Sequence, residues 1–301
     1  MLKTICWGTR GSIPVSGPSY SQHGGSTTCL EIQLIGATGP TPSRVIIDCG
    51  TGLASLARAA GASCRRALFL QTHCHWDHIQ GFPFFSPLFN PLAHFDFWSV
   101  RREGKSLKEV IEAQMSKPFF PVALDDLPAK LNFEEIPAVG TRQLGDLKIS
   151  WMEVCHPSGA SAYRIDYRDR SVVFSGDVEV RKGSRAALVE LAGGADLFIM
   201  DAQYLPEEYA NREGFGHSTP VDAVEVATEA GARRLLMTHH DPSHGDERLA
   251  QKLTIARRRA FGLNSPLQVD NARDGMEVYL TPPATAHREW SRRRPIKSSD
   301  Q

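Results

Sequence analysis

The chain contains the heptapeptide Thr72-His73-Cys74-His75-Trp76-Asp77-His78, which places three imidazoles and one carboxylate within six consecutive positions. It follows residues 67–71, an apolar run of the kind that forms a buried strand. Alternate side chains of an extended segment share a face, so His73 and His75 should point together, and the following turn returns Asp77 and His78 toward them. Imidazole nitrogens and carboxylate oxygens suit a divalent cation such as Zn²⁺. The heptapeptide therefore predicts a metal site at a strand end.

Three later apolar runs also end in a residue that could bind a metal: His156, Asp177 and His239. The ends of strands are where α/β sheets present functional groups. Each of these residues taken alone is more often a structural histidine or a turn aspartate. Together with the heptapeptide they indicate one shared site. His240 is an alternative to His239, but the pattern of strand, threonine and histidine favours His239.

Strand-like and helix-like segments alternate along the chain. Short β-branched runs occupy residues 28–35, 44–49, 67–71, 149–154, 171–174, 197–200 and 235–237. Helical patterns occupy residues 53–60, 106–115, 186–192, 221–230 and 247–261. This alternation predicts an α/β fold or a layered αββα sandwich. The clearest helix start is Ser218-Thr219-Pro220, where a hydroxyl cap precedes proline at the first helical position.

The composition excludes several classes of protein. With 301 residues, 41% hydrophobic and 23% charged, the chain can bury a sizeable core and is not disordered as a whole. The chain has 34 basic residues (Lys and Arg) and 34 acidic residues (Asp and Glu), so its net charge is zero. The molecule as a whole therefore has no positive electrostatic potential that would attract a polyanion. We therefore predict that nucleic acid is an unlikely partner.

The start of the chain lacks the apolar stretch and cleavage site of a signal peptide, and no apolar run is long enough to span a membrane. We expect a cytoplasmic protein without a membrane partner. The six cysteines contain no Cys-x-x-Cys pair and are typical of reduced thiols. Disulfide bonds are not expected.

Two regions differ from the rest. Residues 82–98 are rich in aromatic residues and proline, which predicts a structured insertion. We consider two interpretations of it, a lid that stacks on a flat group over the metal site, and a hydrophobic dimer interface or core packing, and we predict a homodimer. Residues 281–301 are basic and without periodicity, which predicts a mobile tail after a domain of residues 1–280.

These motifs resemble the metallo-β-lactamase superfamily, and the resemblance covers residues 1–280. It implies an αββα sandwich with two divalent metal ions along one edge, Zn²⁺ as first choice and Mn²⁺ as alternative. The resemblance gives the first metal the ligands His73, His75 and His156. It gives the second metal the ligands Asp77, His78 and His239. Asp177 is then the ligand that bridges both metals.

A further motif, Gly216-His217-Ser218-Thr219, resembles the His-Ser-Thr motif of the branch with ribonuclease Z and the cyclic-phosphate phosphodiesterases. In that branch a histidine outside the metal shell protonates the leaving alkoxide, which implies that role for His217. Asp201 would orient it, although Met200-Asp201-Ala202-Gln203 departs from the nuclease pattern His-Glu-Ala-Thr. Asp77, His217 and Asp201 are thus the predicted catalytic residues.

The predicted function is a dinuclear metal-dependent phosphodiesterase acting on a small, for example cyclic, phosphodiester. A general acid helps an alkoxide to leave from phosphorus far more than it helps a thiolate, which favours this reaction over thioester hydrolysis of the glyoxalase II type. A ribonuclease Z-like RNA 3′-processing endonuclease is the other alternative enzyme. Only residues 157–176 separate His156 from Asp177, which leaves no room for the RNA-gripping arm of ribonuclease Z. A metal-binding scaffold without turnover is the alternative from another class.

Three residues are predicted substrate contacts: Arg10, His240 and Ser218. Arg10 lies in an amino-terminal turn, Thr9-Arg10-Gly11-Ser12, that resembles glycine-rich loops near the metals in the same branch. His240 would contact substrate if His239 is the metal ligand. Ser218 belongs to the His-Ser-Thr motif.

Overall fold

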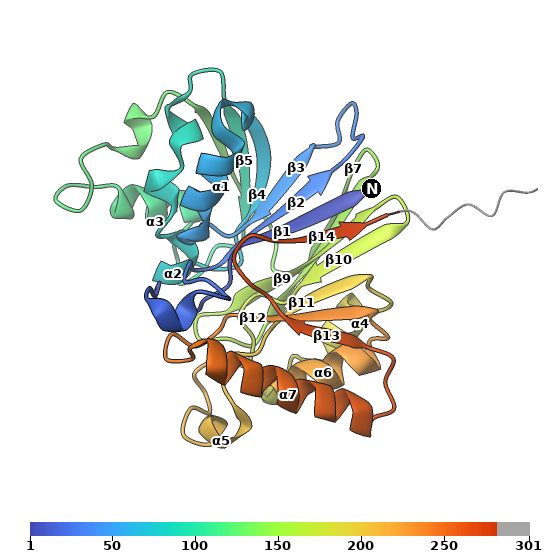
Figure 1. The fold of residues 1–301 in the computed structure, drawn as a ribbon. Coiled ribbons are helices and arrows are strands. Elements are labelled where there is room, and N and C mark those ends of the chain that lie inside the picture. The colour runs from blue at the N-terminus through green and yellow to red at the C-terminus, as the bar shows by residue number, and fades with distance from the viewer. Residues whose placement is uncertain (282–301) are drawn as a thin grey trace, which may run out of the picture.

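Two seven-stranded sheets form the centre of the computed structural model, which describes residues 1–281 (Figure 1). The first sheet has the order β14 (Met276–Leu280), β1 (Leu2–Gly8), β2 (Cys29–Leu34), β3 (Arg44–Ile47), β4 (Arg66–Leu70), β5 (His94–Ser99) and β6 (Lys130–Glu135). The second has the order β13 (Gln268–Asn271), β12 (Arg234–Thr238), β11 (Leu197–Asp201), β10 (Arg170–Phe174), β9 (Ala160–Tyr167), β8 (Leu147–Val154) and β7 (Gly140–Leu144).

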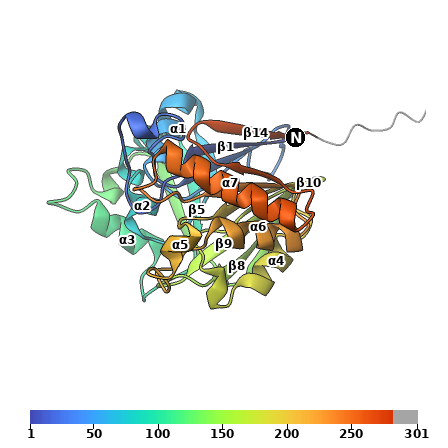
Figure 2. The same ribbon diagram turned by 60° about the horizontal axis from the view of Figure 1, so that its bottom comes forward.

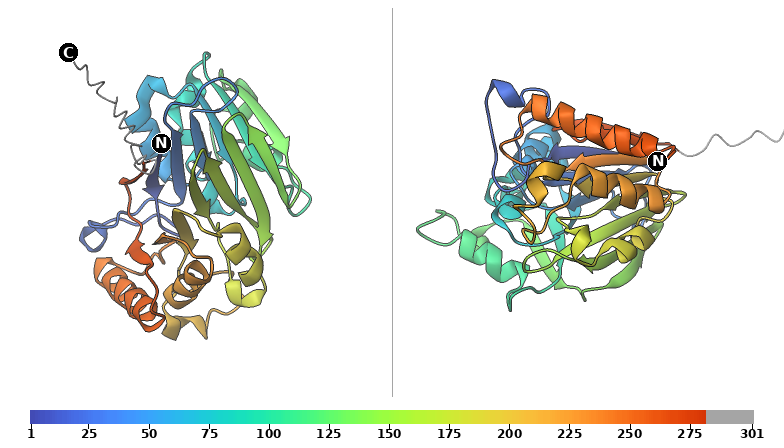
Figure 3. Two further views of the ribbon diagram at one scale, coloured as in Figure 1. Left: turned by 90° about the vertical axis from the view of Figure 1, so that its right-hand side faces the viewer. Right: turned by 90° about the horizontal axis from the view of Figure 1, so that it is seen from below.

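Helices cover the outer face of each sheet, so the predicted αββα sandwich is confirmed (Figure 1). On the first sheet lie α1 (Gly52–Ala60), α2 (Trp76–Ile79) and α3 (Leu107–Gln114). On the second lie α4 (Arg185–Leu191), α6 (Pro220–Glu229) and α7 (Asp246–Gly262), which Figures 2 and 3 show side by side. The short α5 (Pro206–Tyr209) follows β11. None of the helices within residues 1–281 is long and apolar enough to cross a membrane.

Three apolar clusters hold these layers together. One fills the space between the sheets and includes Trp98, Trp151 and Tyr163. The other two lie beneath the helices of each sheet, where burying a large apolar side chain contributes about 1.5–3 kcal/mol. All six cysteines are free thiols, as predicted.

The direction of the strands determines where the functional residues lie. Strands β3 to β6 run parallel, and so do β10 to β13. Parallel strands end at the same edge of a sheet, so the loops that follow β4, β10 and β12 meet there.

The predicted capped start of the helix at Ser218-Thr219-Pro220 is confirmed as well, since Thr219 and Asp222 form a reciprocal capping box at the start of α6.

Much of the aromatic segment 82–98 belongs to the core. It consists of two short 3₁₀ turns and most of β5, and Phe82, Phe85 and Phe97 are buried beneath α1. Several of the rings that motivated a homodimer therefore pack within their own chain, whereas Phe84 and Phe89 are 64% and 47% exposed, and the homodimer stays a prediction. The predicted tail falls almost entirely on residues 282–301, outside the described part of the chain.

Candidate metal centre

The seven predicted metal ligands lie together where the edges of the two sheets meet. His73 and His75 follow β4, and Asp77 and His78 lie on α2. His156, Asp177 and His239 follow β8, β10 and β12. Their donor atoms form adjoining groups, in each of which all atoms lie within 4.8 Å of one another: His73, His75 and His156 in one, and Asp77, His78, Asp177 and His239 in another.

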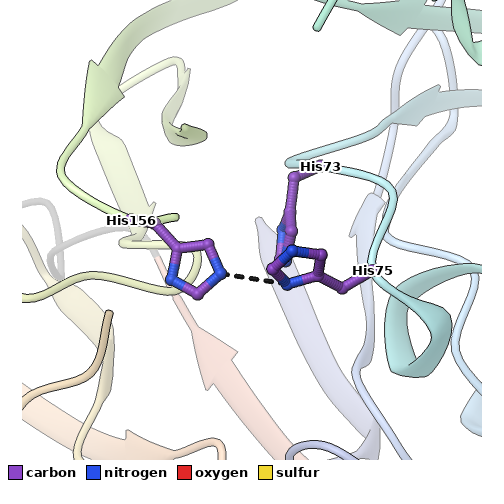
Figure 4. Close-up of side chains that lie close together, drawn as sticks. All are labelled: His73, His75 and His156. Carbon is purple, nitrogen blue, oxygen red and sulfur yellow. Dashed lines mark hydrogen bonds between the residues drawn. The ribbon is translucent and has the colours of Figure 1, made fainter. Parts of the chain in front are cut away.

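The first group consists of three imidazoles from two segments that are far apart in the sequence. Figure 4 shows His73 and His75 on the loop after β4, facing His156 from the other sheet. Nδ1 of His75 and Nε2 of His156 are 3.1 Å apart. Burial lowers the pKa of His156 to about 4 and that of His73 well below its ordinary value. These histidines are thus kept neutral, which is the form that binds a metal.

One carboxylate oxygen faces both groups. Oδ2 of Asp177 lies 3.1 Å from Nε2 of His239, 3.2 Å from Nε2 of His78 and 3.6 Å from Nε2 of His73. Ligand atoms of a tetrahedral site with metal bonds of about 2.0–2.1 Å are about 3.3 Å apart, which matches this spacing. Asp177 is therefore placed to serve both groups, as a bridging ligand would be.

Two buried polar atoms without a hydrogen-bond partner show whether the residues fit a metal. Nε2 of His73 and Oδ1 of Asp177 are buried and have no hydrogen-bond partner within the described residues. Leaving such atoms unpaired costs free energy, so buried polar atoms normally have a partner. Both belong to predicted ligands and lie in the cluster, so a bound cation would satisfy them. The donor set fits divalent metal ions.

Neighbouring oxygens orient the buried histidines. Nδ1 of His78 donates to Oδ2 of Asp48 at 2.7 Å, and Nδ1 of His239 lies 3.1 Å from Oε1 of Gln203. Nδ1 of His156 donates to the main-chain oxygen of Gly216 at 2.9 Å. With Nδ1 engaged, Nε2 is left for the metal, which is the usual arrangement around metal-bound histidines.

Sequence reasoning missed these orienting residues. Asp48 is fully buried at the end of β3, has a φ of +62°, and also accepts from the backbone N–H of Thr72. The sequence does show an aspartate directly after an apolar run, but His78, the histidine that Asp48 orients, is 30 positions away in the sequence.

A glycine is needed at position 11, beside His239, because a Cβ there would lie 2.2 Å from the imidazole ring.

The second group combines two histidines with buried carboxylates. Burial lowers the pKa of His239, but Asp177 and Asp77 more than offset burial and raise it to about 10. Burial likewise disfavours charge on His78, yet the same two aspartates and Asp48 raise its pKa well above the ordinary value. Three buried carboxylates around two histidines create a potential that attracts cations.

The predicted pair His217 and Asp201 is formed next to the cluster. Nδ1 of His217 donates to Oδ2 of Asp201 at 2.8 Å, and Asp201 is fully buried. The His217 ring stacks on that of His239, with centroids 4.7 Å apart and planes at 16°. Donor atoms of His217, Asp201, Asp177 and His239 also lie within 4.8 Å of one another. The pair is therefore close enough to serve the same reaction.

A buried glutamate holds the loop that carries His217. Glu179 accepts from the Tyr209 hydroxyl at 2.6 Å and from the backbone N–H groups of Gly214 and Gly216 at 2.9 and 3.0 Å. Gly216 has a φ of +92°, and a Cβ there would lie 2.2 Å from Nδ1 of His156. Glu179 thus fixes the glycine that both orients His156 and precedes His217.

The three predicted substrate contacts are corrected by the structure. Arg10 is fully buried and donates to three main-chain carbonyl oxygens, so it ties the amino-terminal loop to residues 241–244 instead of facing a substrate. His240 is fully buried and bonds the main-chain oxygen of Ala272 at 3.0 Å. Ser218 is buried and donates to the main-chain oxygen of Val178. Of the neighbouring pair, His239 alone lies in the cluster.

Comparisons with known proteins agree with this geometry. A family model described as a beta-lactamase superfamily domain matches residues 43–240. The chain is 26% identical over 285 residues to ribonuclease Z of Gemmatimonas aurantiaca, covering 78% of this chain and 86% of that protein. A stretch of 78 residues is 41% identical to ribonuclease Z of Brevibacillus brevis, covering 26% of this chain and 23% of that protein.

Among solved structures, human tRNase Z, short form, has a similar fold, with a TM-score of 0.65 at 18% identity. The match covers 93% of this chain and 100% of that chain. The relatives overturn the prediction that nucleic acid is an unlikely partner, because proteins named for cleaving RNA match most of this chain. A net charge of zero averages over the whole molecule and does not describe the surface around one site.

Proposed function

We propose that this chain, which belongs to the metallo-β-lactamase superfamily in its ribonuclease Z-like branch, is a hydrolase that cleaves phosphodiester bonds with two divalent metal ions. Membership of the family supports hydrolysis and a requirement for divalent metal ions. The choice of a phosphodiester rests on residues of this chain. We further propose that residues 1–280 act as one hydrolase domain, because both sheets contribute ligands to a single centre.

The proposed ligands are His73, His75 and His156 for one metal and Asp77, His78 and His239 for the other, with Asp177 shared. Two such cations supply a bound water of lowered pKa and stabilise negative charge at phosphorus. Oxygen and nitrogen donors suit both Zn²⁺ and Mn²⁺. The predominance of histidine makes Zn²⁺ our first choice and Mn²⁺ the alternative.

The observation that carries the proposal is the pair of His217 and Asp201. Because Asp201 accepts from Nδ1, the remaining nitrogen of His217 is available to a substrate held at the adjoining cluster. Held in this orientation, His217 can donate a proton from that nitrogen to the oxygen that leaves phosphorus. An alkoxide needs this proton and a thiolate needs it little, which supports phosphodiester over thioester hydrolysis.

Two kinds of substrate share this chemistry. A small phosphodiester, such as a cyclic nucleotide or a cyclic ribose phosphate, has a ribose oxygen as its leaving group. RNA cleaved near its 3′ end also releases a ribose oxygen, and the relatives named ribonuclease Z support this second candidate. Both need the same centre and the same proton donor.

The test is a substrate panel on protein reconstituted with Zn²⁺ or Mn²⁺. It contains bis-p-nitrophenyl phosphate, cyclic nucleotides, cyclic ribose phosphates, an RNA with a 3′ extension and a glutathione thioester. We expect metal-dependent cleavage of phosphodiesters and little or no cleavage of the thioester. Cleavage of the thioester alone would refute the proposal, and tight metal binding without any turnover would identify a scaffold.

A further inference from the structure

A hollow of about 480 Å³ lies beside α2 and has no role in the proposed reaction. Its volume is within the range of about 300–1,000 Å³ found for small-molecule sites. The residues that line it come from α1, α2, the turn after α2, and α3 with its following loop, and none of them is charged. Figure 1 shows these three helices together on one side of the first sheet. An uncharged lining disfavours a phosphate or a carboxylate as the occupant.

Exposed aromatic rings form much of the lining. Trp76, Phe84 and Phe119 are 63%, 64% and 74% exposed, and the ring of Phe84 packs edge-to-face on Phe120 at 5.7 Å. Phe82 of the same segment is 1% exposed, so Phe84 differs from its buried neighbour in facing solvent. Several exposed rings around one hollow form a surface on which a flat group can stack.

A polar atom in the same lining lacks a partner. The Gln114 amide donates from Nε2 to the main-chain oxygen of Ile79 at 3.1 Å, which fixes Oε1 as the free end. This Oε1 is buried and has no hydrogen-bond partner within the described residues. The terminal torsion of a glutamine side chain is soft, so the oxygen can turn toward an N–H donor held in the hollow. The hollow therefore combines stacking rings with an unpaired acceptor.

The hollow adjoins the candidate metal centre. Trp76 lies between His75 and Asp77, and consecutive α carbons are about 3.8 Å apart. On α2 the side chains of Asp77 and His78 are buried within the cluster, whereas Trp76 is exposed on the helix. His75, the neighbour of Trp76, is the exposed member of the first group. The hollow and the centre therefore border each other along residues 75–77.

We propose that this hollow binds the nucleobase attached to the scissile phosphate, an inference that rests on the proposed phosphodiesterase function. A nucleobase is flat and uncharged, and stacks on Trp76, Phe84 or Phe119. A base with an exocyclic amino group, such as adenine, also supplies the N–H that Oε1 of Gln114 lacks. The base of a mononucleotide and that of an RNA have the same chemistry, so both are candidate sources.

The first experiment measures binding to metal-loaded protein by calorimetry. Adenosine 5′-monophosphate and ribose 5-phosphate have the same phosphate and sugar and differ in the base. We expect the nucleotide to bind about 5- to 100-fold more tightly, with quenching of Trp76 fluorescence. The double variant Phe84→Ala/Phe119→Ala should lose most of this difference, and both rings are exposed, so the fold is kept. Phe261→Ala, at an 84% exposed ring at the end of α7, is the matched control and should keep the difference.

Gln114→Leu tests the acceptor separately. It should reduce the preference for adenosine 5′-monophosphate over the matching purine nucleotide that has no amino group on its base.

Equal affinity of the wild-type protein for adenosine 5′-monophosphate and ribose 5-phosphate would overturn the inference. If phosphodiesters are hydrolysed in that case, the proposed function stands and only the base site is refuted. Absence of both binding and hydrolysis would refute both proposals.

Steady-state kinetics then identify the source of the base. KM is measured for adenosine 2′,3′-cyclic phosphate and for an RNA with a 3′ extension, in the wild-type protein and the Phe84→Ala/Phe119→Ala variant. A rise in KM confined to the cyclic nucleotide assigns the hollow to a mononucleotide. A rise confined to the RNA assigns it to RNA. No rise with either substrate would overturn the inference.

Discussion

The substitution His217→Ala separates proton donation from metal binding. It removes the imidazole that bonds Asp201, but Asp201 keeps its hydrogen bonds from the backbone N–H groups of Val178 and Gln203, both at 3.0 Å. We therefore expect the loop and the metal content to persist. Loss of a general acid lowers kcat by about 10²–10⁴-fold, or about 2.7–5.4 kcal/mol at 1.36 kcal/mol per tenfold change.

The size of this loss depends on the leaving group. An alkyl or ribose oxygen is strongly basic and should show the full loss, whereas p-nitrophenolate leaves without a proton and should show a loss of about tenfold or less. The assay compares kcat for a series of diesters of increasing leaving-group pKa, with metal content determined on the same samples. His94→Ala, at a partly exposed histidine on β5, is the matched control and should leave the whole series unchanged.

Two results would refute this reasoning. Equal losses for good and poor leaving groups would show that His217 binds substrate and does not donate a proton. Loss of metal would show that His217 is a ligand, which is a real test because its donor atom lies within 4.8 Å of those of Asp177 and His239.

Three further predictions concern residues around the centre. Asp201→Asn should lower kcat for poor leaving groups by less than His217→Ala does, since Asp201 only orients the imidazole through its hydrogen bond with Nδ1; an equal loss would contradict this. Glu179→Gln should lower kcat with little change in metal content, measured in parallel, because Glu179 holds the glycine before His217. Burial lowers the pKa of Lys252 from 10.5 to about 7, so between these values only the unfolded chain holds the proton. The unfolding free energy should therefore rise with pH there, and Lys252→Met should remove that slope in urea titrations.

Much of the fold and of the centre could be predicted from the sequence because both leave local patterns. Buried parallel strands are short apolar runs, and His156, Asp177 and His239 each follow one directly. The capping box of α6 is likewise contained in a few consecutive residues. Such local signals determined the sandwich and the positions of all the clustered residues.

The failures involved long-range contacts and burial. Arg10 was predicted to contact substrate because its turn resembles glycine-rich loops near the metals, yet its three carbonyl partners include main-chain groups more than 200 positions away. Asp48 and Gln203 were missed because their histidine partners are distant in sequence. For residues 82–98 a dimer interface and core packing both stayed open, because composition alone does not say which rings face the chain's own core.

The central claim is that this chain hydrolyses phosphodiesters with two divalent metal ions, and metal content measured together with activity tests it most directly. Elemental analysis should find close to two metal ions per chain in the wild-type protein. His75→Ala and Asp177→Ala should lose metal and bis-p-nitrophenyl phosphate hydrolysis together, because each lost ligand leaves a cation undercoordinated. A wild-type protein that holds no metal after reconstitution, or that keeps its hydrolytic activity after complete removal of metal by a chelator, would contradict the claim.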